Sequence, residues 1–240
     1  MAKPRRQSKP SVKALLAKAS SFYYKDRYRQ ALAPAKKVLE VEKQNETALF
    51  YLAHGLYYAG QLRRSLQYWK RLWTISPSGR YVNLNMGACY SDLGKTSLAV
   101  ASYKQELKLY PACGKALYNL GVIYYDGRKY KLAAHYLERC YSQRHSVDAI
   151  VCKLAHSYFK TGQLEKEQLL YEEFLQTNPD DTWALNNLGS HFMEQGEYYR
   201  ALIRLKKAAR LDPNDKLVAK NIRKALREAK KLKSSAANKA

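Results

Sequence analysis

The stretch RYVNLNMGACYSDLGKTSLAVASYKQELKLYPAC at residues 80–113 decides the fold, because its landmarks return elsewhere in the chain, for example in TWALNNLGSHFMEQGEYYRALIRLKKAARLDPND at residues 182–215. Two sets of residues recur at a spacing of 34 or twice 34: Gly60, Gly94, Gly162 and Gly196, and Pro77, Pro111, Pro179 and Pro213. Self-similarity at a fixed period of this size is typical of a repeat architecture.

Each repeat has the pattern of two helices joined by a tight turn. In the stretch 80–113, Asn83, Met86 and Tyr90 follow the spacing i, i+3, i+7, which is one face of a helix. Gly94 is placed to end this first helix, and Pro111 is placed to end the second. A hairpin of this size cannot bury its apolar face alone, so we expect neighbouring hairpins to stack.

This pattern resembles the tetratricopeptide repeat, in which a large residue at position four precedes Leu at seven, a small residue at eight, Tyr at eleven, Gly at fifteen, a small residue at twenty, an aromatic residue at twenty-four, a small residue at twenty-seven and Pro at thirty-two. The third repeat matches with Asn83, Met86, Gly87, Tyr90, Gly94, Ala99, Tyr103, Glu106 and Pro111. The resemblance covers six contiguous repeats at 12–45, 46–79, 80–113, 114–147, 148–181 and 182–215. It implies an all-α fold, a right-handed superhelical solenoid of helix-turn-helix repeats.

The segments outside the repeats are basic. We expect residues 1–11 to form an N-terminal arm, residues 216–233 to form a capping helix, and residues 234–240 to form a flexible tail. Arg223 stands at position eight of the capping segment, where it prevents a second helix from approaching. The fifth repeat departs from the pattern with Glu167 at the small position twenty, so its second helix is expected to sit differently.

Composition limits the class of protein. The 240 residues include 43 Lys and Arg against 20 Asp and Glu, for a net charge of +23, and 46% of them are hydrophobic. This hydrophobic content excludes wholesale disorder. No run approaches the about 20 apolar residues of a membrane span. The basic N-terminus is not followed by the apolar stretch of a secretory signal, and we expect a cytoplasmic location.

The face of the first helices opposite their packing side carries many aromatic and amide side chains. We predict that these residues line a peptide-binding groove on the concave surface of the solenoid. They are Phe50, His54, Tyr57, Tyr81, Asn85, Tyr118, Asn119, Tyr125, Lys153, His156, Phe159, Trp183 and Asn187. The alternative, that these side chains pack between neighbouring first helices, stays open on the sequence alone.

The Asn residues at position six form a row that is similar to the asparagine ladder of the tetratricopeptide array in O-GlcNAc transferases. Asn85, Asn119 and Asn187 belong to this row, which is interrupted at Lys153. The resemblance implies that the amides hold the main chain of an extended peptide, because one amide both donates and accepts hydrogen bonds. The alternative is that these Asn residues are ordinary polar residues on a helix surface.

The positive charge is concentrated at the two ends of the chain and on predicted second helices. One interpretation is a contact with an anionic partner such as nucleic acid or an acidic protein. The other is that the charge only keeps the protein soluble. The residues proposed for anionic contacts are Arg5, Arg6, Arg63, Arg64, Lys224, Arg227, Lys230 and Lys231.

No motif for catalysis, phosphate binding or metal binding is found, so we expect neither an enzyme nor a cofactor or metal site. The leading hypothesis is a protein–protein interaction scaffold or assembly chaperone that binds an extended or helical segment of another protein. A nucleic-acid-associated adaptor of ribonucleoproteins is one alternative. Self-assembly into a homo-oligomer, with the acidic fifth repeat meeting a basic end, is another.

Overall fold

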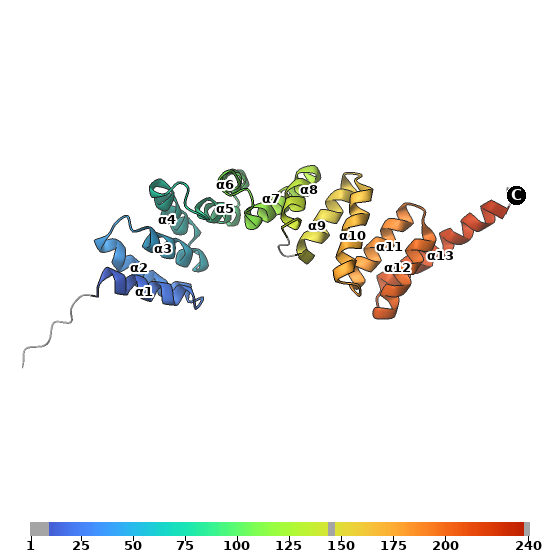
Figure 1. Cartoon of the computed structure of the whole chain (residues 1–240), viewed down its shortest axis with the longest axis horizontal. Helices are drawn as coiled ribbons and strands as arrows, with labels where there is room; N and C mark the ends of the chain where they lie inside the picture. The colour runs from blue at the N-terminus through green and yellow to red at the C-terminus, as the bar shows by residue number, and fades with distance from the viewer. Residues whose placement is uncertain (1–9, 144–146, 238–240) are drawn as a thin grey trace, which may run out of the picture. The chain divides into compact units, whose positions relative to one another are not determined.

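The computed structural model describes residues 10–143 and 147–237, and within them every regular element is an α-helix (Figure 1). Consecutive helices from α1 to α6 and from α8 to α13 pack against each other, which confirms the predicted all-α repeat fold. The helices are α1 (Val12–Tyr23), α2 (Tyr28–Val41), α3 (Glu46–Tyr58), α4 (Leu62–Ile75), α5 (Val82–Asp92), α6 (Thr96–Leu109), α7 (Gly114–Asp126), α8 (Tyr130–Tyr141), α9 (Val147–Lys160), α10 (Leu164–Thr177), α11 (Thr182–Glu194), α12 (Tyr198–Leu211) and α13 (Lys216–Ala237). The chain forms two compact units, the N-terminal unit of residues 1–123 and the C-terminal unit of residues 124–240.

The turn inside each hairpin uses a left-handed backbone conformation at position fifteen. The four glycines at this position, from Gly60 to Gly196, have φ angles between 70° and 76°. Two repeats place another residue there: Asp26 and Arg128, both with φ 56°. A side chain with a Cβ is strained in this conformation. In the fourth repeat the sequence offers Gly127 one residue earlier, yet the structure gives the left-handed position to Arg128.

Small residues at position eight let the two helices of a hairpin approach closely. A Cβ added to Gly87 would lie 2.6 Å from Cε1 of Tyr103, at position twenty-four of the same repeat. A Cβ added to Gly189 would lie 2.7 Å from Cγ of Leu205, which is the equivalent contact in the sixth repeat. Both distances are below those that carbon atoms reach in packed interiors. The large residue of the second helix therefore fills the space that the glycine leaves.

Neighbouring repeats meet at a recurring pair of positions, twenty on one second helix and ten on the next first helix. Between α4 and α5 this joint consists of Ser65 and Cys89, whose Oγ and Sγ lie 3.5 Å apart. Between α10 and α11 it consists of Glu167 and His191, both buried, with Oε2 and Nδ1 3.1 Å apart. A buried carboxylate is costly unless it is paired. His191 supplies the partner that lets Glu167 occupy a position reserved for small residues.

The third repeat begins without the usual helix cap. Ser11, Asn45 and Asp181 each accept a hydrogen bond from a backbone N–H in the first turn of the helix that follows. Tyr81, at the start of α5, has φ 69° and makes no such bond. The buried Glu106 replaces it, because its carboxylate accepts from the backbone N–H of Tyr81 at 3.0 Å and of Leu84 at 3.2 Å. Glu106, at a position that favours small residues, thus satisfies the free end of α5.

The capping helix α13 packs against α12 and contacts α11. Val218 joins Leu185 and Ala208 in one core cluster, whereas Arg223 at position eight is exposed. The helix extends to Ala237, four residues beyond the predicted end at 233. Ser and Ala in this stretch are compatible with a helix. The remaining residues of the predicted tail, 238–240, lie outside the described part of the chain.

Replacing Arg128 by Gly is expected to stabilise the protein. The substitution removes the strain of the left-handed conformation at this position, and we expect a gain of about 0.5–1 kcal/mol in the free energy of unfolding. Urea unfolding followed by circular dichroism measures it. Arg128→Ala, which keeps a Cβ, is the matched control and should show little change. A Gly variant no more stable than the Ala variant would contradict the assigned turn.

Replacing Glu106 by Gln is expected to destabilise the protein by about 1–3 kcal/mol, the cost of an unpaired buried polar group. Gln has a single acceptor oxygen, and its NH2 group would face one of the two backbone N–H donors. The same unfolding measurement applies. Glu40→Gln on the exposed side of α2 is the control and should change the stability by less than about 0.5 kcal/mol; equal effects of the two variants would show that Glu106 is not a cap.

Candidate functional site

The predicted groove residues lie on the first helices α3, α5, α7, α9 and α11, and none of them is buried. Tyr81, Phe159 and Trp183 are 41%, 36% and 39% exposed, and the remainder are half-buried. The residues from Phe50 to Asn119 belong to the N-terminal unit, and those from Tyr125 to Asn187 belong to the C-terminal unit. Each unit therefore presents its own set of candidate binding residues.

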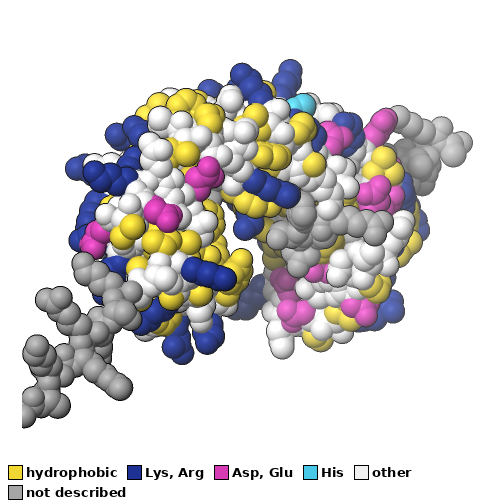
Figure 2. Space-filling view, turned by 60° about the vertical axis from the view of Figure 1, so that its left-hand side comes forward, with side chains coloured by type: hydrophobic (Ala, Val, Ile, Leu, Met, Phe, Trp, Pro, Cys, Tyr) yellow, Lys and Arg dark blue, Asp and Glu magenta, His cyan; other side chains and the backbone are white. Residues whose placement is uncertain are grey.

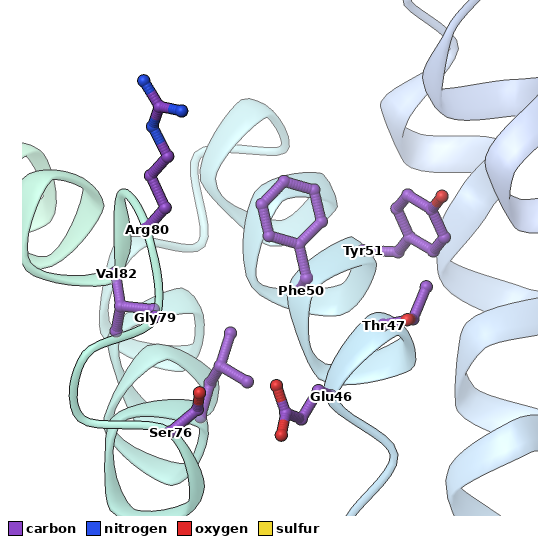
Figure 3. A pocket seen from close by; sticks show the side chains of 9 residues that line it. Glu46, Thr47, Phe50, Tyr51, Ser76, Gly79, Arg80 and Val82 are labelled. Atoms are coloured by element: carbon purple, nitrogen blue, oxygen red, sulfur yellow. The ribbon is translucent and has the colours of Figure 1, made fainter.

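A pocket of about 240 Å³ opens in the N-terminal unit between α3 and the start of α5 (Figure 3). Its apolar lining comes from Phe50 and Tyr51 of α3, Leu72 of α4 and Val82 of α5. The polar lining is Glu46, Thr47, Ser76 and Arg80, together with Gly79. The pocket therefore combines apolar side chains with polar and charged groups. The sequence analysis proposed only Phe50 of these residues.

Arg80 carries a cation at this pocket. Its guanidinium carbon lies 5.0 Å from the ring centroid of Tyr81 and 5.9 Å from that of Tyr110, which places the cation against two aromatic rings. Within the described residues it makes no ion pair with a carboxylate. The guanidinium is thus held in place and available to an anionic group of a ligand.

His54 is enclosed by aromatic rings. Its ring centroid lies 5.3 Å from that of Tyr23, 5.0 Å from that of Phe50 and 5.6 Å from that of Trp69. Burial, with a smaller contribution from the charge of Lys115, lowers the pKa of His54 to about 4, so the side chain is neutral at pH 7. The predicted groove residues around His54 thus pack between α1 and α3, as the alternative interpretation expected. This packing leaves His54 little freedom to contact a ligand.

The C-terminal unit brings Tyr125, Lys153 and His156 together. The hydroxyl of Tyr125 lies 2.7 Å from Nδ1 of His156. Lys153 places its Nζ 4.8 Å from the ring centroid of Tyr125, and the ring of Tyr130 lies 5.6 Å from that of His156. Burial lowers the pKa of His156, the nearby Lys160 acting in the same direction. The cluster offers half-exposed rings with polar edges.

The amides of the predicted asparagine row are partly used within the protein. Nδ2 of Asn85 donates to the carbonyl of Tyr81 at 2.7 Å, and Nδ2 of Asn187 donates to the carbonyl of Trp183 at 2.8 Å. Each of these side chains retains one N–H and its oxygen for a ligand. Asn119 is hydrogen-bonded to Tyr103. The Asn side chains of this row are therefore held in place by hydrogen bonds within the protein.

The residues proposed for anionic contacts lie on the surface wherever the structure describes them. Arg63 and Arg64 of α4 are exposed, as are Lys224, Arg227, Lys230 and Lys231 of α13. Figure 2 shows Lys and Arg side chains along the outer edge of the N-terminal unit, at the left of the view. Arg5 and Arg6 lie outside the described residues.

Sequence reasoning missed Arg80 and Glu46 at the pocket because both stand at position one, which the pattern leaves unassigned. The signal that could have found Arg80 is the interrupted spacing before α5, where Ser78 and Gly79 replace a capping residue. None of the helices in residues 10–143 and 147–237 is both long enough and apolar enough to cross a membrane. In the same part of the chain no three His, Cys, Asp or Glu side chains are grouped in a way that could hold a metal ion.

Solved structures with the same fold include YrrB, "a TPR protein with an unusual peptide-binding site". It has a TM-score of 0.65 and 20% identity, and the match covers 78% of this chain and 97% of YrrB. The structure of Naa15/Naa10 bound to HypK-THB also has a TM-score of 0.65, with 19% identity, over 94% of this chain and 35% of the matched chain. These likenesses show the fold alone.

Among curated proteins, the BBSome complex member BBS4 of Bos taurus is 24% identical over 196 residues, which are 81% of this chain. The match spans 37% of the length of BBS4. A family model for the tetratricopeptide repeat matches residues 89–145 and 152–216, just over half of the chain. With its helical hairpins and their glycine turns, this chain belongs to the tetratricopeptide repeat family.

Proposed function

We propose that the protein is a non-catalytic scaffold whose N-terminal unit binds an extended segment of another protein along the inner face of its first helices. The observation that carries the proposal is the pocket between α3 and α5 with the unpaired Arg80 at its edge. An apolar side chain of the partner enters the pocket, and an adjacent Asp or Glu pairs with Arg80.

The size of the pocket supports a peptide side chain as its occupant. Pockets for small molecules have volumes of about 300–1,000 Å³, and this one has about 240 Å³. Leu72 and Val82 contribute apolar side chains to its lining, and Thr47 and Ser76 contribute hydroxyl groups. One aliphatic or aromatic side chain fills such a space and leaves the peptide main chain outside.

The positive charges near the pocket support a partner segment that carries an acidic residue next to this apolar side chain. Arg80 makes no ion pair within the described residues, and Lys115, on the next first helix, is exposed. Asn85, one turn beyond Tyr81 on α5, keeps an amide oxygen and one N–H that suit a peptide group. A segment lying across α3 and α5 would meet these groups in succession.

The fold comparisons agree with this use of the repeat surface. YrrB is described as having a peptide-binding site, and Naa15/Naa10 is described in a complex with HypK-THB. Binding of peptides and partner proteins is thus compatible with this architecture. The contacts proposed at Arg80 and the pocket are inferred from the side chains of this protein and not from the compared structures.

The proposal predicts a sequence preference that two variants abolish. Twelve-residue peptides selected from a phage-displayed library by the full chain should contain a large apolar residue next to Asp or Glu. In fluorescence anisotropy, Arg80→Gln should weaken the binding of these peptides at least about tenfold, since a charge-assisted hydrogen bond contributes about 1.5–3 kcal/mol. Thr47→Phe, which fills the pocket from an exposed position, should weaken it similarly.

Arg63→Gln on the exposed side of α4 is the matched control, because it removes the same charge away from the pocket and should leave the affinity within about twofold. Circular dichroism confirms that each variant is folded. Selected peptides that bind wild type, Arg80→Gln and Thr47→Phe equally would rule out this pocket as the binding site.

A further inference from the structure

The C-terminal helix α13 has a strongly basic surface that the peptide site does not use. Residues 216–237 contain eight Lys and Arg and a single acidic residue, Glu228. Val218, Ala225 and Ala229 are buried and define the side of the helix that packs on α12. The side facing away from them carries exposed cations: Lys220, Arg223, Lys224, Arg227, Lys230 and Lys231.

These cations are repeated at each turn of the helix. At about 1.5 Å of rise per residue, the run from Lys220 to Lys231 spans about 16 Å, so the surface carries one positive charge in about 3 Å. Duplex nucleic acid carries one negative charge in about 1.7 Å of its axis. The two charge densities are of the same order, which allows several cations of one helix to meet phosphates at the same time.

The charge of this surface is not neutralised within the protein. Glu228 pairs with Arg227 at 3.0 Å and with Lys231 at 3.1 Å, and these two cations are still 68% and 65% exposed. The other four make no ion pair within the described residues. Elsewhere in the C-terminal unit, Lys166 and Lys207 each lie within 3.0 Å of a carboxylate oxygen. Exposed cations that make no ion pair within the described residues also occur elsewhere in this unit, for example Lys129, Lys131, Lys206 and Arg210. What distinguishes α13 is that six cations share one side of a single helix.

We propose that the outward surface of α13 binds the phosphate backbone of double-stranded nucleic acid without reading its sequence. Lys and Arg are suited to phosphate contacts, which position a protein on the duplex and carry no sequence information. The exposed leucines of α13 argue against a lipid surface as the partner. At about 100° per residue, Leu217, Leu226 and Leu232 lie about 80–140° from the centre of the cationic side. A membrane in contact with the cations would leave these leucines outside.

The test measures binding of the full chain to a fluorescein-labelled 20-base-pair DNA duplex by anisotropy at 50 and 200 mM salt. If about four phosphates are contacted, the affinity should fall about 100-fold over this range, by release of counterions. The variant Lys220→Gln, Arg223→Gln, Lys224→Gln, Lys230→Gln leaves the partners of Glu228 in place. It should bind the duplex at least about 100-fold more weakly at 50 mM salt, with a nearly flat salt dependence, so that it does not exceed wild type at 200 mM.

The matched control removes the same charge from exposed positions of α2 and α4, with Lys36→Gln, Lys37→Gln, Arg63→Gln and Lys70→Gln. It should keep the affinity within about threefold, because nonspecific attraction to the whole protein is screened within about 10 Å at 0.1 M salt. Circular dichroism spectra and thermal unfolding like those of wild type check that both variants are folded.

Three outcomes would overturn the proposal: equal loss in both variants, binding by wild type that does not depend on salt, or an effect of the α13 substitutions on vesicles of phosphatidylcholine and phosphatidylserine with none on the duplex. Failure of the α13 test leaves the peptide site untouched, since that site lies in the other unit.

Discussion

The hairpins of this protein depend on a small residue, Gly or Ala, at position eight of the first helix. Tyr103 occupies the space that a Cβ on Gly87 would take, and Leu205 does the same at Gly189. The close approach of two helices lets large side chains of the second helix cover the first, which gains hydrophobic burial in a unit too small to form a core alone. A regular spacing of these contacts along the chain keeps the first helices in register, and that register brings Phe50 and Val82 to one pocket.

The repeat period predicted the hairpins and their turns, because these follow from backbone conformation and helix periodicity. It did not predict which residue takes the left-handed position in the fourth repeat. Gly127 and Arg128 are adjacent, and the left-handed conformation falls on Arg128, which stands at position fifteen of its repeat. The pattern also could not show that Glu106 accepts a hydrogen bond from the start of α5. Residues that meet in space can lie at any separation in the sequence.

The candidate site was predictable to a similar degree. Helical phase placed Phe50, Tyr81 and Trp183 on the side of the first helices away from the hairpin core, and all three retain exposed surface. The phase could not separate rings that fill gaps between helices from rings that face solvent. His54 shows why: the space around it is shaped by Tyr23 and Trp69, which come from two other helices. The pocket itself depends on Arg80, in a connection for which the repeat pattern has no rule.

The joint between positions twenty and ten differs from repeat to repeat while its geometry is kept. In one place it is a hydroxyl beside a thiol, and in another a carboxylate beside an imidazole. A repeat carrying Glu167 tolerates only a successor that offers a hydrogen-bonding group at position ten, since an apolar residue there would strand a buried charge. The hairpins therefore have similar backbones but cannot be exchanged with one another, because the hydrogen-bonded pair at positions twenty and ten fixes their order. Gene duplication or recombination that inserted a foreign repeat between the fifth and the sixth would be selected against unless the residues facing Glu167 and His191 changed together.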